Sequence, residues 1–193
     1  AVTSRLETLR PPGRALLAAA AVLGRRFPVA VAQDIAGLDD PSLGDQLRAG
    51  LSAQLVRPDD EPGWYQFHHP LMAEALLTQL TPDARAATAR AAADLVEARF
   101  PGLPGYWCQL VASLRLQAGD TTAAGRLFGE AGRRALAAGA VNSAVELLER
   151  AGELLATHTD PGERASVLES MLTAMTEAGQ VDRALAAAAT IDE

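Results

Sequence analysis

The sequence predicts a mostly α-helical protein in which one short β-hairpin interrupts a long series of helices. Hydrophobic residues make up 49% of the chain but aromatic residues only 4%. The hydrophobic class is dominated by Ala, which loses no side-chain entropy on entering a helix. Apolar residues recur at helical spacing on both sides of a single strand–turn–strand pattern. Together these two observations favour closely packed helices with little sheet.

Three helices are expected before the hairpin. The first begins at Pro11, since Pro is acceptable at a helix start, and Gly24 ends it. Gly37 ends the second, and the third follows the turn at residues 39–41. Their predicted ranges are 11–23, 29–36 and 42–53. In the third, a leucine recurs every four residues, which predicts one narrow buried stripe of Leu43, Leu47 and Leu51.

A hairpin and a fourth helix complete the first expected domain. Residues 55–57 and 64–67 have the composition of strands, and the dense turn signal of residues 58–63 separates them. A helix then opens at His69 and Pro70. One side of it is expected to consist of Leu71, Met72, Ala75, Leu76 and Leu80. Three helices, a hairpin and a closing helix predict a winged-helix domain over residues 1–81.

Residues 82–193 are expected to form antiparallel helical hairpins similar to tetratricopeptide repeats. The predicted helices are 83–100, 106–118, 121–138, 141–157, 162–178 and 181–191. Gly119, Gly139 and Gly179 lie 20 and then 40 residues apart, and each is followed five positions later by Ala. A Gly suits a left-handed helix end, and the Ala allows the next helix to pack closely. The sequence has no initiator Met and no recognisable capping repeat, so we expect a truncated array from a longer protein.

The charge of the chain argues against a nucleic-acid surface. The formal net charge is −7, and residues 11–80 carry five Arg against eight acidic residues. Because affinity for DNA depends largely on neutralising phosphates, direct nucleic-acid binding by this segment is not expected. All 17 basic residues are Arg, so a Walker-type lysine site is excluded on this chain. No set of acid, base and nucleophile can be nominated, and the chain is expected to be non-enzymatic.

Cysteine usage indicates a reducing compartment. Cys108 is the single cysteine, and with His68, His69 and His158 it does not form a zinc spacing. The longest apolar run, residues 15–23, is shorter than the ~20 residues that span a bilayer. The sequence therefore predicts a cytoplasmic protein with neither a metal nor a membrane anchor.

Two stretches carry a family resemblance. The sequence LRPPGRALLAAAAVLGRRF at residues 9–27, together with YQFHHPLMAEAL at residues 65–76, resembles the large ATP-binding LuxR-type transcriptional regulators of actinobacteria. These belong to the signal-transduction ATPases with numerous domains. The resemblance implies a P-loop nucleotide-binding domain, a helical domain, a winged helix, a tetratricopeptide-like sensor and a C-terminal helix-turn-helix. This chain would cover the third element and the start of the fourth.

The resemblance also supplies the one candidate site residue. In the wider ATPase class, the helix after the wing opens with a Met-His-Asp motif whose His touches the β-phosphate of ADP. His69 is at the matching place, and Pro70 replaces the Asp. The cofactor, ATP or ADP, would be held by an upstream nucleotide-binding domain in cis. The alternative interpretation is that His69 simply begins a helix and binds no ligand.

The resemblance implies a regulatory segment that couples nucleotide state to an inducer or partner bound by the repeats. The alternatives are a tetratricopeptide-like adaptor, or the sensor arm of a cyclase or kinase. Arg25 and Arg26 could reach a phosphate or a neighbouring domain, but a solvated helix end is favoured for them. Tyr106, Trp107 and Cys108 could line a ligand groove, but core positions are favoured. No activating neighbour marks Cys108 as a nucleophile.

Overall fold

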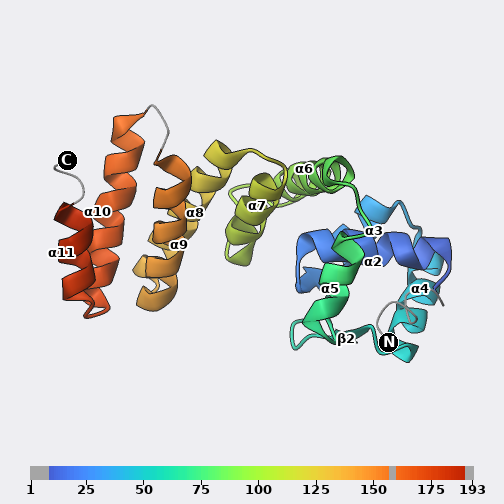
Figure 1. Ribbon diagram of the computed structural model, residues 1–193. Coiled ribbons are helices and arrows are strands. Elements are labelled where there is room, and N and C mark those ends of the chain that lie inside the picture. The colour runs from blue at the N-terminus through green and yellow to red at the C-terminus, as the bar shows by residue number, and fades with distance from the viewer. Residues whose placement is uncertain (1–8, 157–159, 190–193) are drawn as a thin grey trace. The chain divides into compact units, whose positions relative to one another are not determined.

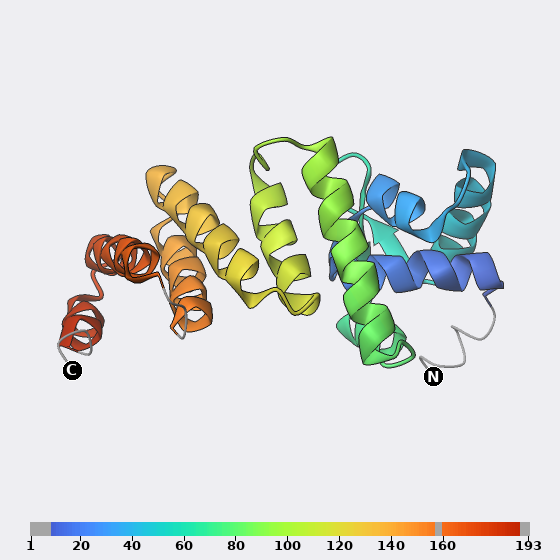
Figure 2. The ribbon, with the colours of Figure 1, turned by 90° about the horizontal axis from the view of Figure 1, so that it is seen from above.

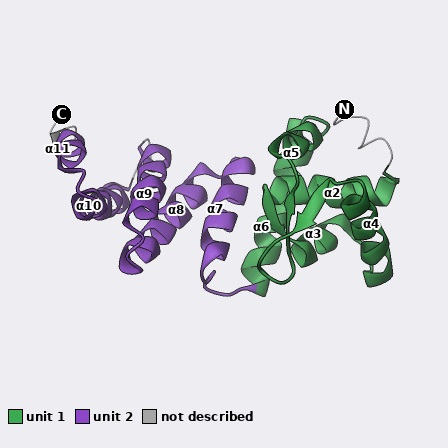
Figure 3. Ribbon diagram, turned by 90° about the horizontal axis from the view of Figure 1, so that it is seen from below, with its two compact units in different colours: residues 1–99 green, residues 100–193 purple. Residues whose placement is uncertain are grey.

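The computed structural model describes residues 9–156 and 160–189 (Figure 1). Within these ranges the protein is mostly helical, with ten helices and a small three-stranded antiparallel sheet. The chain forms two compact units that divide between Arg99 and Phe100 (Figure 3). The predicted fold class, mostly α with a short β-hairpin, is confirmed at this level.

The first unit is built around helix α2 (Pro11–Leu23), which packs against four other helices (Figure 1). These are α3 (Val29–Ala36), α4 (Asp40–Ser52), α5 (Pro70–Leu77) and α6 (Pro82–Arg99). Leu16, Leu17, Val22 and Leu23 of α2 are all buried, as its apolar sequence requires. Gly24 ends the helix with a φ of 124°, a conformation that side chains disfavour.

The sheet contains the predicted hairpin and one strand that was not predicted. Strands β2 (Val56–Pro58) and β3 (Trp64–Phe67) pair antiparallel, with Val56 opposite Phe67. Strand β1 (Arg26–Pro28) pairs with the other edge of β3 and places Phe27 opposite Tyr65. Strand β1 has only three residues and ends in a proline, so its sequence shows no alternation of apolar and polar residues. It can be recognised as a strand only by its pairing with β3.

Two predicted apolar faces differ from the observed ones. Leu43, Leu47 and Leu51 of α4 are half-buried, and Gly50 is the buried residue of that helix. In α5, Met72 and Leu76 are buried as expected, but Leu71 is 53% exposed. Ala73 is buried there, and Leu80 lies beyond the end of the helix. Helical spacing alone does not say which side of a short helix meets the core.

Helix α6 belongs to the first unit, whereas the expected boundary at residue 81 placed it with the repeats. It packs on α2 and α3, and Arg99 Nη1 lies 2.8 Å from Asp34 Oδ2 of α3. The small residues of α6 allow this approach, because Ala89, Ala92 and Ala93 are completely buried. The division at residue 99 therefore follows from packing and not from the change in composition near residue 82.

The described part of the second unit is a series of five helices in which each packs on the next (Figure 2). They are α7 (Tyr106–Gln117), α8 (Thr121–Ala137), α9 (Val141–Leu155), α10 (Pro161–Glu177) and α11 (Val181–Ala189). These ranges agree closely with the predicted ones. His158 and the predicted ends of two helices, Thr157 and Ile191, lie outside the described residues.

The turns of this unit repeat one geometry. Gly119, Gly139 and Gly179 have φ values of 85°, 76° and 72°, so the predicted left-handed helix ends are confirmed. In each turn the glycine N–H donates to the carbonyl three residues before it, and the next N–H donates to the carbonyl five residues before its own. The alanines five positions after the glycines, Ala124, Ala144 and Ala184, are buried at the helix contacts.

Helices α8 and α9 approach closely because α8 carries glycines on the contact face. A Cβ on Gly125 would lie 2.7 Å from Leu155 Cγ, and one on Gly132 would lie 2.6 Å from Leu148 Cγ. Both leucines are completely buried. The missing side chains of α8 thus make room for the leucines of α9.

No helix in the described part of the chain is long and apolar enough to cross a membrane.

Candidate functional site

His69 lies at the start of α5, on the surface of the first unit. It is the N-cap residue, with φ −135° and ψ 133°, and its imidazole does not cap the helix. Its carbonyl accepts the Met72 N–H at 3.0 Å. His68, His69, Pro70 and Leu71 are all exposed. Four consecutive exposed residues, one of them a leucine, form a surface that we call the α5 tip.

Two short contacts hold the α5 tip in place. The His68 N–H donates to the Leu55 carbonyl at 2.9 Å, beside strand β2. Phe67, the last residue of β3, is completely buried against Phe27, with ring centroids 5.4 Å apart. The backbone that leads into His69 is therefore anchored on the sheet, while the imidazole itself stays accessible.

Arg26 is held by the hairpin, so the predicted solvated helix end does not apply to it. Its Nη2 atom lies 2.9 Å from Asp59 Oδ1 and 2.6 Å from Glu61 Oε2, and its guanidinium lies 4.4 Å from the centroid of the Trp64 ring. Hydrogen bonds to these two carboxylates raise the pKa of Arg26. The hydrogen bond from Arg26 to Asp59 in turn lowers the pKa of Asp59. Arg25 is exposed, as expected for a solvated residue.

Of the three residues that begin α7, Tyr106, Trp107 and Cys108, one rather than three lies in the core. Cys108 is 1% exposed, and its thiol donates to the Leu127 carbonyl at 3.4 Å. Burial raises the pKa of this thiol. Trp107 is half-buried and stacks on Phe100 with ring centroids 3.9 Å apart. Tyr106 is 42% exposed, so the core position expected for it is wrong.

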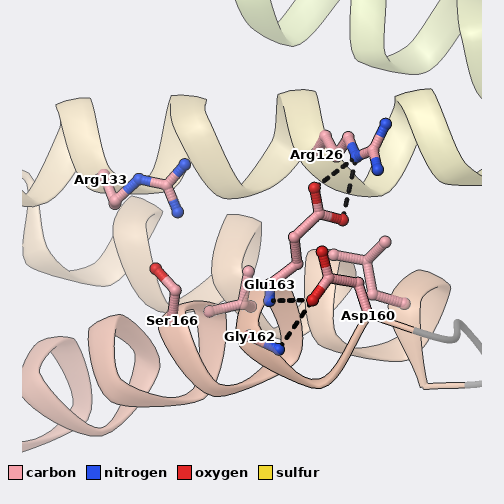
Figure 4. A pocket seen from close by; sticks show the side chains of 8 residues that line it. Arg126, Arg133, Asp160, Gly162, Glu163 and Ser166 are labelled. Carbon is pink, nitrogen blue, oxygen red and sulfur yellow. Dashed lines mark hydrogen bonds and ion pairs between the residues drawn. The ribbon is translucent and has the colours of Figure 1, made fainter.

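A groove of about 520 Å³ lies between α8 and α10, with Leu155 of α9 beside it (Figure 4). We call it the α8–α10 groove. Its lining residues are Arg126, Arg133, Leu155, Asp160, Gly162, Glu163, Ser166 and Val167. Sequence reasoning did not find this site, because its walls come from helices whose contact is set only by tertiary packing.

One wall of the groove is positioned by the start of α10. Asp160 is the N-cap residue, and its Oδ1 accepts the N–H groups of Gly162 and Glu163 at 2.9 and 3.4 Å (Figure 4). This cap fixes Glu163, whose carboxylate lies 2.8 and 3.0 Å from Arg126 Nε on α8. The ion pair raises the pKa of Arg126. It also bridges the two walls at one end of the groove.

The remaining polar groups of the groove are mostly hydrogen-bond donors. Arg126 uses its Nε atom for Glu163, which leaves its terminal nitrogens without a partner among the described residues. Arg133 Nη2 lies 3.1 Å from the Glu130 carboxylate, and Arg134 Nε lies 2.9 Å from the same carboxylate. Hydrogen bonds from Arg134 and Arg133 lower the pKa of Glu130. Arg133 therefore shares its carboxylate partner with Arg134, which does not line the groove. The donors that Arg126 and Arg133 present in the groove favour a ligand rich in acceptors.

Comparison of the chain with protein-family models, with curated proteins and with solved structures found no match.

Proposed function

We propose that this chain is a regulatory segment of an ATP-dependent LuxR-type transcriptional regulator of the signal-transduction ATPase class. In this proposal the first unit is a winged helix that contacts an upstream nucleotide-binding domain through His69. The second unit is a tetratricopeptide-like sensor that binds an inducer or a protein partner. ATP or ADP belongs to the parent protein, and the segment itself performs no catalysis.

The topology of the first unit supports the winged-helix part of the proposal. The elements follow the order helix, strand, helix, helix, strand, strand, and the sheet order is β1-β3-β2. The turn between β2 and β3 then forms the wing, and α2, α3 and α4 form the three-helix core. Arg26 fixes the wing by joining β1 to Asp59 and Glu61.

The exposed α5 tip is the observation that carries the assignment of His69. Its imidazole is not used to cap its own helix, and Leu71 beside it is 53% exposed. An exposed leucine next to an accessible imidazole suits contact with another domain, where the leucine would be buried. A histidine at a helix start can also approach an anionic phosphate, which the helix N-terminus itself favours.

The repeated geometry of the second unit supports the sensor part. Stacked helical hairpins present extended surfaces that bind ligands, and the α8–α10 groove offers donors from Arg126 and Arg133. For ligand binding to act as a switch, the ligand must bind one nucleotide state of the protein more tightly than the other. We infer that the ligand favours the open, ATP-bound state and so releases the contact made by His69.

The full-length protein provides the test. Replacing His69 with Ala is expected to speed release of bound ADP and to raise basal activity, because a phosphate contact in the closed state is lost. A lost hydrogen bond to a charged group corresponds to a change of about tenfold or more in the release rate. The matched control is His68→Ala, which removes the neighbouring exposed imidazole. Equal ADP release from both variants and the unchanged protein would remove the assignment.

A tetratricopeptide-like adaptor remains the second candidate, and the α8–α10 groove is the observation that favours it. Its donors suit the carbonyl groups of an extended peptide. The complete reading frame separates the candidates: a Walker motif upstream and a helix-turn-helix downstream support the regulator. A cyclase or kinase domain in place of the helix-turn-helix would assign the same sensor arm to another effector.

A further inference from the structure

A second pocket lies on another face of α10, between α9 and α11. Its volume is about 730 Å³, which is within the range of sites that hold small molecules. The lining residues are Glu149, Gly152, Glu153, Leu155, Ala156, Arg164, Val167, Leu168, Met171 and Arg183. We call it the α9–α11 pocket. It shares Leu155 and Val167 with the α8–α10 groove, and the other residues differ.

The floor of this pocket is apolar. Leu155, Val167 and Met171 are each less than a tenth exposed, and Leu168 is half-buried beside them. On α10 the residues Arg164, Leu168 and Met171 follow one another at helical spacing, so they lie on one face. A ligand in the pocket would therefore meet an apolar floor, while the charged side chains of the rim surround it.

The rim of the pocket carries two acidic and two basic residues, and most of these charges are already paired. Arg183 of α11 forms an ion pair with Glu149 of α9 and so joins the two helices. Glu153 lies 4.0 Å from Arg150. Arg164 forms no ion pair with any residue in the described part of the chain. Its guanidinium is the one rim charge left uncompensated among the described residues.

We propose that the α9–α11 pocket binds a small amphiphilic carboxylate. The carboxylate would lie on the guanidinium of Arg164, which can donate two parallel hydrogen bonds to it. The hydrocarbon portion would cover Leu155, Val167, Leu168 and Met171. A cationic ligand is less favoured, because Glu149 is already paired with Arg183 and Arg150 lies 4.0 Å from Glu153. An uncharged amphiphile would leave Arg164 without a counterion.

This site is independent of the proposed function. It requires neither an upstream domain nor a ligand in the α8–α10 groove. Leu155 and Val167 line both sites, but none of the other residues of the α9–α11 pocket lines the groove. If the His69 experiment fails, the proposed carboxylate site is unaffected. If the binding experiment on the α9–α11 pocket fails, the His69 assignment is unaffected.

The chain offers a matched pair of variants for blocking the pocket. Gly152 lines the pocket from the interior of α9, and a Cβ built on it meets nothing within 4 Å. Gly152→Phe is therefore expected to fill the pocket without a clash. Gly152→Ala adds only a methyl group and should leave the pocket open. Helix content measured by circular dichroism would verify that both variants fold.

The binding experiment uses decanoate, kept below the concentration at which it forms micelles, and isothermal titration calorimetry on the purified chain. Saturable binding of decanoate at one site is expected. Decanol, which has the same chain length but no charge, should bind at least about tenfold more weakly. Arg164→Gln should weaken decanoate binding by a similar factor, and Gly152→Phe should abolish it. Arg48→Gln, which removes an exposed charge from α4, should have no effect.

Four results would overturn the proposal. Decanoate does not bind at all, or it binds to Gly152→Phe as it binds to the unchanged protein, in which case the pocket is not the site. If decanol binds as tightly as decanoate, or Arg164→Gln has no effect, the pocket does not recognise a carboxylate.

Discussion

Gly132 of α8 and Gly152 of α9 both lie inside helices, but their surroundings are opposite. A Cβ on Gly132 would lie 2.6 Å from Leu148 Cγ and 3.3 Å from the Leu148 backbone nitrogen, whereas one on Gly152 would meet nothing within 4 Å. The sequence shows the same residue type in the same kind of helix. Only the partner helix distinguishes a glycine that is required from one that is tolerated.

The two glycines should respond oppositely to the same substitution. Gly132→Ala is expected to lower the free energy of unfolding by about 1–3 kcal/mol, because α9 must move away from the new methyl group. Gly152→Ala is expected to raise it by up to about 1 kcal/mol through helix propensity. Urea unfolding followed by circular dichroism measures both. Similar shifts for both variants would contradict the close contact of α8 with α9.

Cys108 should make the stability of the protein depend on pH in the alkaline range. Burial raises the pKa of its thiol in the folded state, whereas the unfolded chain ionises near a pKa of about 8.5. The contribution of this thiol to the free energy of unfolding is therefore fully present below that pH. It is lost as the pH rises toward the pKa of the folded state. The expected loss in free energy of unfolding is below about 1.4 kcal/mol per pH unit.

Urea unfolding at pH 7 and at pH 9.5 checks this expectation, with Cys108→Ala as the control that removes the titrating group. Alkylation of the thiol at pH 7 should also be slow until urea unfolds the chain, since Cys108 is 1% exposed. A thiol that reacts at the same rate in the native protein and in urea would show that α7 does not bury it.

At the scale of the element, the turns of the second unit were recognisable in the sequence because their chemistry is local. A left-handed residue after a helix strongly favours Gly, so Gly119, Gly139 and Gly179 mark helix ends without any knowledge of the fold. Strand β1 had no such marker. Its residues are extended because Arg26, Phe27 and Pro28 pair with β3, which lies almost forty residues further along the chain.

Gly139→Ala is expected to destabilise the second unit by about 1–2 kcal/mol. The residue has a φ of 76°, which costs that amount for a side chain, although a Cβ there would meet nothing within 4 Å. The loss therefore comes from backbone conformation and not from packing. Thermal unfolding of Gly139→Ala beside Gly139→Asn separates the two causes, because Asn tolerates the left-handed region better and should recover part of the stability.

At the scale of the whole molecule, two compact units each have a hydrophobic core and a tryptophan. Trp64 lies in the first unit, where it is buried beside Arg26. Trp107 lies in the second, stacked on Phe100. Because each unit makes most of its contacts internally, damage to one core should not transfer fully to the other.

Leu148→Ala tests this division. Leu148 is completely buried in the core of the second unit, and its truncation is expected to cost about 2–5 kcal/mol. Placed in a Trp64→Phe background, the change should lower the urea midpoint reported by Trp107 fluorescence. In a Trp107→Phe background, the midpoint reported by Trp64 should stay close to its starting value. Equal shifts in both backgrounds would mean that the units unfold together.

The sequence by itself determined the helices, most of their ends and the hairpin, because periodicity, capping and turn chemistry act over a few neighbouring residues. It also pointed to His69 as a residue at a helix start. Only the tertiary structure decided that α6 packs with the first unit, that β1 pairs with β3, that Leu71 is exposed, and that α8, α9, α10 and α11 enclose a groove and a pocket. These features depend on contacts between residues far apart in the chain, and local patterns do not encode which surfaces will meet.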